Sequence, residues 1–194
     1  MVIGEGAEAQ IYLENILGLE MVVKVRQRKE YRIPEIDEPM RRRRTRKEAG
    51  LMIVASKAGI NVPHVIAVGK FSIYMEKIGG KLLKDIQNSK TYMEKVGKEL
   101  ARMHDSGIVH GDYTPANIMI SGNETTIIDF GLADMSLDPE QKAVDLLLMK
   151  RSVTRGMYAH FEHAYVNASR NGTAVKKQLA ETERRGRYQS RTLS

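Results

Sequence analysis

The fold of this chain is decided by HGDYTPAN at residues 110–117 and by DFG at residues 129–131. Two short apolar runs between them flank a turn, so residues 118–128 are predicted to form a β-hairpin. The hairpin would bring Asn117 and Asp129, one at each of its ends, back toward each other. Two converging oxygen ligands suit Mg²⁺, which binds carboxylates together with phosphate oxygens.

The position of Asp112 predicts proton transfer. Asp112 lies shortly before Asn117, where a substrate hydroxyl could hand its proton to the carboxylate. The order H-x-D-x-x-x-x-N, followed by D-F-G, is the catalytic signature of protein kinases. We therefore predict Asp112 as the catalytic base, with Asn117 and Asp129 as metal ligands. The alternative is that these residues only shape turns and end a strand.

A glycine-rich loop is predicted near the N-terminus. Short apolar pieces at residues 1–3 and 10–13 enclose a segment whose backbone N–H groups can approach phosphates closely. A plain hairpin turn is the alternative. The loop begins almost at the first residue, which fits either a minimal start or a domain of a longer fused chain. The predicted nucleotide-binding residues here are Gly4, Glu5, Gly6, Ala7, Glu8, Ala9 (where kinases have a third glycine) and Ile11.

A buried ion pair is predicted between the next strand and the helix after it. Residues 20–25 predict a strand whose Val-Val-Lys matches the kinase V-A-I-K motif, so Lys24 is expected to bind the α- and β-phosphates. A lysine in an apolar strand needs a partner. Glu48 is the candidate, because Met52 and Ala55 continue its helix face at helical spacing. A solvated surface glutamate is the alternative. The predicted catalytic set is Lys24, Glu48 and Asp112.

The helix that carries Glu48 is predicted to span residues 39–58. Asp37 is expected as its N-cap, a proline would lie near its first position, and Gly59 would follow its last turn. The segment before it, residues 26–37, is heavily charged and contains proline, which predicts a loop.

The remaining pattern predicts two lobes. Residues 64–69 and 71–76 predict two further strands, which complete a five-stranded antiparallel sheet. The backbone of the hinge that follows would bond the adenine ring, and its predicted nucleotide-binding residues are Met75, Glu76 and Ile78. Helices are predicted at residues 81–88, 91–106, 155–168 and 172–185, and from Asp138 onward. The predicted fold class is therefore α+β, a minimal two-lobed kinase-like fold with an N-lobe at residues 1–78 and a mainly helical C-lobe at residues 79–194.

Two departures from ordinary kinases affect the function. Gly111 stands where H-R-D has the arginine that docks a phosphorylated activation loop, so switching of that kind is not expected. Only residues 132–144 separate DFG from Asp145, which lies in a helix predicted to be buried because its residues are nearly all apolar. There is no A-P-E motif. The platform that holds a peptide substrate is therefore predicted to be missing or reduced. Asp145 needs a partner and is expected to bond the catalytic-loop backbone.

Composition narrows the function classes. The chain has 194 residues, a net charge of +7 and no cysteine, which excludes disulfides, thiolate catalysis and Cys-ligated zinc. No apolar run approaches the roughly 20 residues that span a bilayer. Clustered basic residues attract nucleic acid or acidic partners, although a solvated helix face is the alternative. The arginines predicted to contact nucleic acid or a protein partner are Arg41, Arg42, Arg43 and Arg44, together with Arg184, Arg185 and Arg187 in a basic C-terminal tail.

These motifs together resemble the PRPK family, the small atypical kinase of the KEOPS (EKC) complex. The resemblance spans nearly the whole chain and rests on residues 4–9, 29–37, 46–49, 110–117, 128–132, 143–146 and 185–187. It implies ATP and Mg²⁺, with Mn²⁺ as an alternative metal, and ATP hydrolysis or autophosphorylation rather than broad protein phosphorylation. It also implies a cytoplasmic protein, with no membrane contact, that supports threonylcarbamoyladenosine formation in tRNA. The implied partners are tRNA, other small KEOPS subunits and the threonylcarbamoyl-transferase subunit, to which archaeal members are sometimes fused.

Two other functions remain open at this point. A stand-alone Ser/Thr or small-molecule kinase is one, because His-Gly-Asp also occurs in aminoglycoside-type kinases and the Rio kinases are similarly short. A non-enzymatic module that holds tRNA on its basic face is the other. Phosphorylation of a free peptide or small molecule would favour the kinase. An intact catalytic and metal-binding set argues against the non-enzymatic module.

Overall fold

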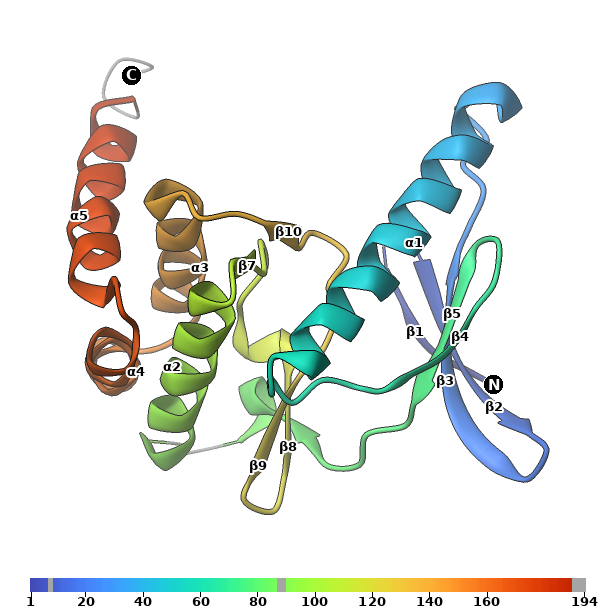
Figure 1. Cartoon of the computed structure of the whole chain (residues 1–194), viewed down its shortest axis with the longest axis horizontal. Coiled ribbons are helices and arrows are strands. Elements are labelled where there is room, and N and C mark those ends of the chain that lie inside the picture. The colour runs from blue at the N-terminus through green and yellow to red at the C-terminus, as the bar shows by residue number, and fades with distance from the viewer. Residues whose placement is uncertain (7–8, 87–89, 190–194) are drawn as a thin grey trace.

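The N-terminal part of the molecule is a sheet covered by one long helix (Figure 1). The computed structural model describes residues 1–6, 9–86 and 90–189. The sheet is antiparallel, in the order β1-β2-β3-β5-β4, which confirms the prediction of five strands. The strands are β1 (Val2–Glu5), β2 (Ala9–Ile16), β3 (Leu19–Arg26), β4 (Val65–Val68) and β5 (Ser72–Glu76), and the helix is α1 (Pro34–Lys57).

Helix α1 begins earlier than predicted. Its first residue is Pro34, at a position where the missing N–H of proline costs no helical hydrogen bond. Asp37 is therefore not the N-cap, and the loop prediction is wrong for residues 34–37. Instead Asp37 is buried and accepts a hydrogen bond of 2.6 Å from Arg41 Nε, while the Arg41 guanidinium lies 3.8 Å from the centre of the Phe71 ring. These contacts anchor the extra turn to the sheet.

The C-terminal part is mainly helical, with a hairpin on the side that faces the sheet (Figure 1). The predicted hairpin is confirmed as β8 (Ile118–Ser121) and β9 (Glu124–Ile127). The long helices are α2 (Lys90–Asp105), α3 (Pro139–Ser152), α4 (Arg155–Ala168) and α5 (Gly172–Gln189). The short elements are β6 (Lys81–Leu82), η1 (Leu83–Asp85), β7 (Ile108–Val109), η2 (Pro115–Asn117) and β10 (Asp134–Met135).

The helices pack through one continuous apolar core that also reaches the sheet. Helices α2 and α4 approach most closely at Gly97, where an added Cβ would lie 2.4 Å from the Phe161 carbonyl oxygen. The apolar side chains of Val96, Leu100 and Met103 on α2 are buried in this core. These contacts fix the C-terminal helices behind the hairpin.

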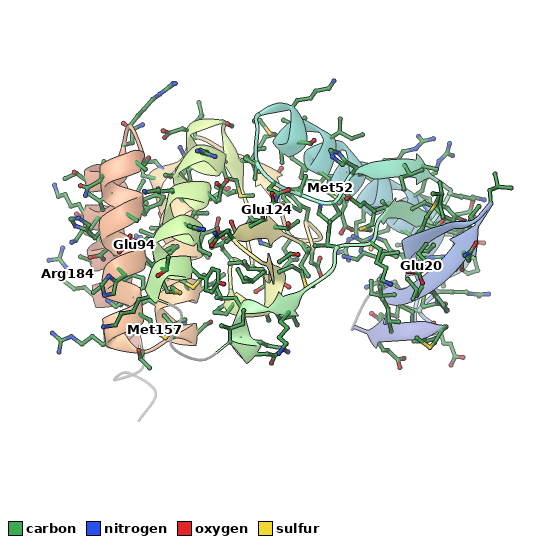
Figure 2. All side chains as sticks on the ribbon, turned by 90° about the horizontal axis from the view of Figure 1, so that it is seen from below. Glu20, Met52, Glu94, Glu124, Met157 and Arg184 are labelled. Carbon is green, nitrogen blue, oxygen red and sulfur yellow. The ribbon has the colours of Figure 1, made fainter. Side chains whose placement is uncertain are left out.

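Three details of the C-terminal part differ from the predictions. No helix forms over residues 81–86, because Lys81 and Leu82 pair with β8 as a strand and a single 3₁₀ turn follows; residues 87 and 88 of that prediction lie outside the described residues. Helix α5 continues to Gln189, so Arg184 and Arg185 lie on it rather than in a tail, and Arg184 lies at the outer surface (Figure 2). On α3, predicted to be buried nearly all round, Val144 is 37% exposed.

No helix in the described part of the chain combines the length and the apolar character that crossing a membrane requires.

Candidate active site

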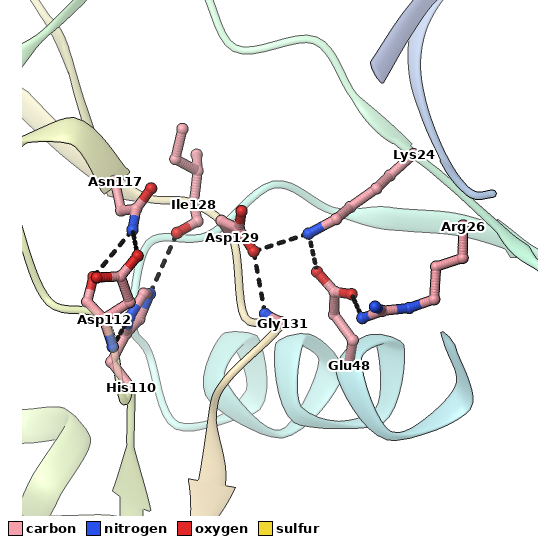
Figure 3. Close-up of polar contacts among 9 residues, drawn as sticks. All are labelled: Lys24, Arg26, Glu48, His110, Asp112, Asn117, Ile128, Asp129 and Gly131. Carbon is pink, nitrogen blue, oxygen red and sulfur yellow. Dashed lines mark hydrogen bonds and ion pairs between the residues drawn. The ribbon is translucent and has the colours of Figure 1, made fainter. Parts of the chain in front are cut away.

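The sheet and the C-terminal part meet at a buried ion pair. Lys24 on β3 donates hydrogen bonds to Glu48 Oε1 on α1 at 2.6 Å and to Asp129 Oδ1 at 2.7 Å (Figure 3). Burial alone would lower the pKa of Lys24, but the two carboxylates outweigh it and raise that pKa above its ordinary value. The ammonium group is therefore charged, and the predicted contact between Lys24 and Glu48 is present.

Asp129 is held in an unusual backbone conformation. Its φ is +61°, in the left-handed region that side chains other than glycine rarely adopt and that is often found at functional sites. Its Oδ1 also accepts a hydrogen bond from Gly131 N at 3.1 Å. Burial raises the pKa of the Asp129 carboxyl, but Lys24 and the Gly131 amide outweigh it and hold the pKa below its ordinary value. The side chain is 52% exposed, so an ionised oxygen is open to the cleft.

Asp112 and Asn117 contact each other and line the same cavity as Asp129. The Asn117 Nδ2 donates to the Asp112 backbone oxygen at 2.9 Å and to its Oδ2 at 2.8 Å (Figure 3). Both partners accept hydrogen bonds, which assigns the amide nitrogen to this side and leaves the Asn117 oxygen for another ligand. Because Ile128 N donates to the Asn117 backbone oxygen, the hairpin carries Asn117 and Asp129 to the same end. Two oxygen ligands of this type fit Mg²⁺.

Asp145 holds the backbone of the predicted catalytic loop, residues 110–117. It is fully buried on α3, and its two carboxylate oxygens accept hydrogen bonds from His110 N and Gly111 N, each at 2.8 Å. The prediction that Asp145 bonds this backbone is confirmed. Sequence reasoning missed a third partner, His104, whose Nε2 lies 3.1 Å from Asp145 Oδ2. Burial lowers the pKa of His104 and outweighs the attraction of Asp145, so the imidazole is neutral at pH 7.

The structure explains why glycine replaces the arginine of H-R-D. Gly111 has a φ of +77°, and a Cβ on it would lie 2.5 Å from the Leu132 carbonyl oxygen. The chain after DFG therefore passes directly over this position. A side chain at residue 111 would strain the backbone and push Leu132 away.

We expect Gly111→Ala to destabilise the protein by more than the roughly 1–2 kcal/mol that a left-handed backbone costs a residue with a Cβ. Gly122→Ala is the matched control, because Gly122 also has a positive φ but a Cβ there would meet nothing within 4 Å. Urea unfolding of both variants isolates the contact with Leu132. An equal loss of stability in the two variants would contradict this contact.

Two adjoining cavities extend from the ion pair. One, of about 270 Å³, is mostly apolar, and the predicted nucleotide-binding residues that line it are Ile11, Lys24, Met75, Glu76 and Ile78. The other, of about 660 Å³, lies under the glycine-rich loop and is lined by Gly4, Glu5, Gly6, Ala9, Asp112, Asn117 and Asp129, among others. Ala7 and Glu8 lie outside the described residues. An apolar slot beside a polar one suits a base joined to phosphates, and nucleotide binding by these residues stays a prediction.

Arg26 belongs to the site but was not predicted. It lies two residues after Lys24 on β3, and its Nη2 donates to Glu48 Oε2 at 2.6 Å (Figure 3). Residue spacing of two places both side chains on one face of a strand. That spacing is the signal in the sequence that could have identified Arg26.

The arginines predicted to contact nucleic acid or a protein partner lie in different surroundings. Arg41 is engaged within the molecule by Asp37 and Phe71, whereas Arg42 and Arg43 are exposed on α1. On α5, Arg184 is exposed, and Arg185 Nη2 lies 2.8 Å from Glu140 Oε1. Arg44 is partly buried, and the side chain of Arg187 is outside the described residues.

The chain has extensive sequence similarity to known proteins. The family model of the RIO domain matches residues 19–173. The KEOPS complex subunit Bud32 of Pyrococcus abyssi is 35% identical, with 98% of this chain and 97% of the relative covered. This chain belongs to the Bud32 family of RIO-domain proteins. The resemblance to the PRPK family of KEOPS subunits is thereby confirmed.

Other Bud32 relatives fall into two kinds. A probable serine/threonine-protein kinase BUD32 homolog of Archaeoglobus fulgidus is 36% identical over 96% of this chain and 95% of its own length. A probable bifunctional tRNA threonylcarbamoyladenosine biosynthesis protein of Methanothermobacter thermautotrophicus is 34% identical over 96% of this chain. This chain spans only 36% of the length of that bifunctional relative. This chain thus matches relatives of about its own length and a relative that is much longer.

Solved structures confirm the kinase-like fold of this Bud32 family member. The Rio2 kinase of Chaetomium thermophilum, in a complex with ADP/Mg²⁺ and phosphoaspartate, matches with a TM-score of 0.66 at 18% identity, over 96% of this chain and 70% of that one. The protein WaaP in complex with acyl carrier protein matches with a TM-score of 0.66 at 17% identity, over 96% of this chain and 87% of that one. The predicted α+β fold is therefore confirmed.

Proposed function

We propose that this chain binds Mg·ATP between an N-lobe of residues 1–78 and a C-lobe of residues 79–194, and that it hydrolyses ATP or transfers its γ-phosphoryl group. The observation that carries the proposal is that Lys24 Nζ contacts both Glu48 Oε1, at 2.6 Å, and Asp129 Oδ1, at 2.7 Å. A lysine bound to a helix glutamate, beside the aspartate of D-F-G, is the arrangement that phosphoryl transfer requires.

Each polar residue of the site has a role in this reaction. Asn117 and Asp129 would hold the metal, which neutralises phosphate charge when bound. Lys24 would bind the α- and β-phosphates, and Glu48 keeps its ammonium group in place. Asp112 would accept the proton of the attacking hydroxyl or water, and its contact with Asn117 fixes the carboxylate. The Asp129 carboxylate, which contacts Lys24 in this structure, would bind the metal instead.

The second part of the proposal concerns the group that accepts the γ-phosphoryl. Only residues 132–138 separate D-F-G from α3, which leaves little room for a platform that holds a peptide. A platform that is missing or much reduced leads us to favour ATP hydrolysis or autophosphorylation over broad protein phosphorylation. A stand-alone kinase for small molecules is the alternative, and the intact set of charged residues disfavours a purely tRNA-holding module.

We propose a place in a cytoplasmic tRNA-modifying complex, and the names of the relatives support the complex. One is named as a KEOPS subunit, and others are bifunctional proteins of threonylcarbamoyladenosine biosynthesis. A long bifunctional relative fits a domain that works beside a threonylcarbamoyl-transferase partner. We propose that this chain acts with that partner, with the other small KEOPS subunits and with tRNA.

The deciding experiment measures Mg-dependent ATP turnover by the full chain, alone and with the transferase subunit and tRNA. Turnover that rises when both are added supports the proposal. Robust phosphorylation of a free peptide or small molecule, with no response to either partner, would favour the stand-alone kinase.

The ion pair gives a prediction of its own. Lys24→Ala should weaken the binding of ATP phosphates, and Glu48→Ala should do so indirectly by releasing Lys24. The double variant should be little worse than either single variant, because the two residues act as one unit. ATP affinity and turnover of the three variants form the double-mutant cycle, and additive losses would mean that the two residues act independently.

The basic surface gives another prediction. If exposed arginines contact tRNA, removing their charge should weaken tRNA binding while basal ATP turnover survives. The test variants are the double variant with Arg42→Gln and Arg43→Gln, and the single variant Arg184→Gln. Removing one arginine–phosphate interaction should reduce the log–log salt slope by about 0.7–0.9. Arg41 is left intact, because it anchors α1. The control is Arg151→Gln, an exposed arginine on α3.

Binding should be measured over a salt series, with and without the transferase subunit. Unchanged tRNA affinity and an unchanged salt slope in both settings would exclude the contact.

A further inference from the structure

Arg26 is a strongly buried charge beside the candidate site that the roles above do not use. It is 4% exposed and lines the larger cavity together with the glycine-rich loop and Asp112. We propose that Arg26 is a positioning residue: it fixes Glu48 from the side opposite Lys24, so that Glu48 can hold the Lys24 ammonium group toward the ATP phosphates. The inference rests on the proposed function, since it concerns how the same site holds phosphate.

The geometry of Glu48 is the first support. Its carboxylate is shared, with Oε1 bound by Lys24 and Oε2 bound by Arg26, both at 2.6 Å. Glu48 itself is 2% exposed. When phosphate oxygens attract the Lys24 ammonium, the bond to Arg26 keeps the carboxylate from following it. A charge-assisted contact of this length is among the stronger hydrogen bonds in proteins.

The position of Arg26 is the second support. It lies at the end of β3, directly opposite Ala9 of the glycine-rich loop in the strand register, two residues beyond the pairing of Lys24 with Ile11. A Cβ on Gly131 would lie 3.6 Å from Lys24 Nζ and 3.8 Å from Arg26 Nη2. Both cations thus face the loop that carries Asp129.

The backbone of Arg26 is also fixed on both sides. Its N–H donates to the Phe71 oxygen at 2.9 Å, and its carbonyl accepts from Arg41 Nη1 at 3.2 Å. Arg41 stacks on Phe71, so the end of β3 is clamped between α1 and β5. The guanidinium is therefore held in place before any ligand arrives.

The test compares the affinity of the full chain for ADP·Mg and for adenosine, which lacks phosphates. Arg26→Gln should weaken ADP·Mg binding about 10–100-fold, the value of a hydrogen bond to a charged group, and leave adenosine binding unchanged. Arg26→Lys keeps the charge and should recover most of the ADP·Mg affinity; it also serves if Arg26→Gln does not fold. Arg28→Gln, an exposed arginine two residues further along, is the matched control and should bind both ligands normally.

A double-mutant cycle with Glu48→Gln then tests whether Arg26 acts through Glu48. Arg26→Gln should add little to the loss in ADP·Mg affinity that Glu48→Gln causes, because Arg26 acts on Lys24 through Glu48. Unchanged ADP·Mg affinity in Arg26→Gln, or an equal loss for adenosine, would overturn the inference. If the unmodified chain itself shows no preference for ADP·Mg over adenosine, the proposed function fails and the inference fails with it.

Discussion

Asp112→Ala is expected to lower ATP turnover by about 10²–10⁴-fold, the usual contribution of a positioned base, and to leave Mg·ATP binding nearly intact. The Asp112 carboxylate contacts Asn117 Nδ2 at 2.8 Å and does not touch Lys24 or Glu48 in the described structure. Its loss therefore removes the proton acceptor without disturbing the ion pair.

Asp129→Ala is the matched comparison within the same prediction. It should remove both turnover and most of the Mg-dependent affinity, because Asp129 is the main candidate ligand for the metal and also contacts Lys24 at 2.7 Å. Nucleotide titrations with Mg²⁺ and with EDTA, beside turnover assays, separate the two variants. An equal loss of binding in both would contradict this division of roles.

The parts of the fold that could be predicted are those with local signals. Hairpin β8–β9 follows from two apolar runs around a four-residue turn, and α3 begins where Asp138 caps it by accepting a hydrogen bond from Glu140 N. The contact of Asp145 with the catalytic loop follows because a buried carboxylate must find donors. Such features depend on a few adjacent residues or on a general rule of burial.

The start of α1 could not be predicted, because its deciding contacts join residues far apart in the chain. Pro34 and Pro39 are both acceptable early helical residues. The stacking of Arg41 on Phe71, thirty positions away, selects the earlier start. In the same way, the arginine run alone does not show that Arg41 is engaged while Arg42 is exposed.

The contacts among the predicted site residues were easier to predict than the residues that support them. Lys24, Asp112, Asn117 and Asp129 follow a motif spacing that the sequence displays, and the structure brings Lys24 to Asp129 and Asn117 to Asp112. The residues that hold this set, Arg26 and His104, obey only packing and charge balance. Several residue types can satisfy those conditions, so no fixed spacing reveals them.

Asp145→Ala is expected to cause the largest loss of stability among the variants considered. It would leave His110 N and Gly111 N buried without their acceptor, and each unpaired donor costs about 1–3 kcal/mol, so we expect about 2–6 kcal/mol in total. The neutral His104 would lose the partner of its Nε2, while its Nδ1 would keep its contact with the Tyr165 hydroxyl. Because both amides belong to the loop of Asp112, ATP turnover should fall even at temperatures where the variant is folded.

Asp138→Ala is the control for this variant, since it removes an aspartate from the same helix and only the N-cap contact with Glu140 N. Removing an N-cap costs about 1 kcal/mol. Asp145→Asn adds a finer test: the amide keeps the shape of the carboxylate but turns an NH₂ group toward one of the two backbone donors. Urea unfolding and ATP turnover of the three variants measure the two effects. If Asp145→Ala unfolds no more easily than Asp138→Ala, the catalytic loop is held by contacts other than those of Asp145.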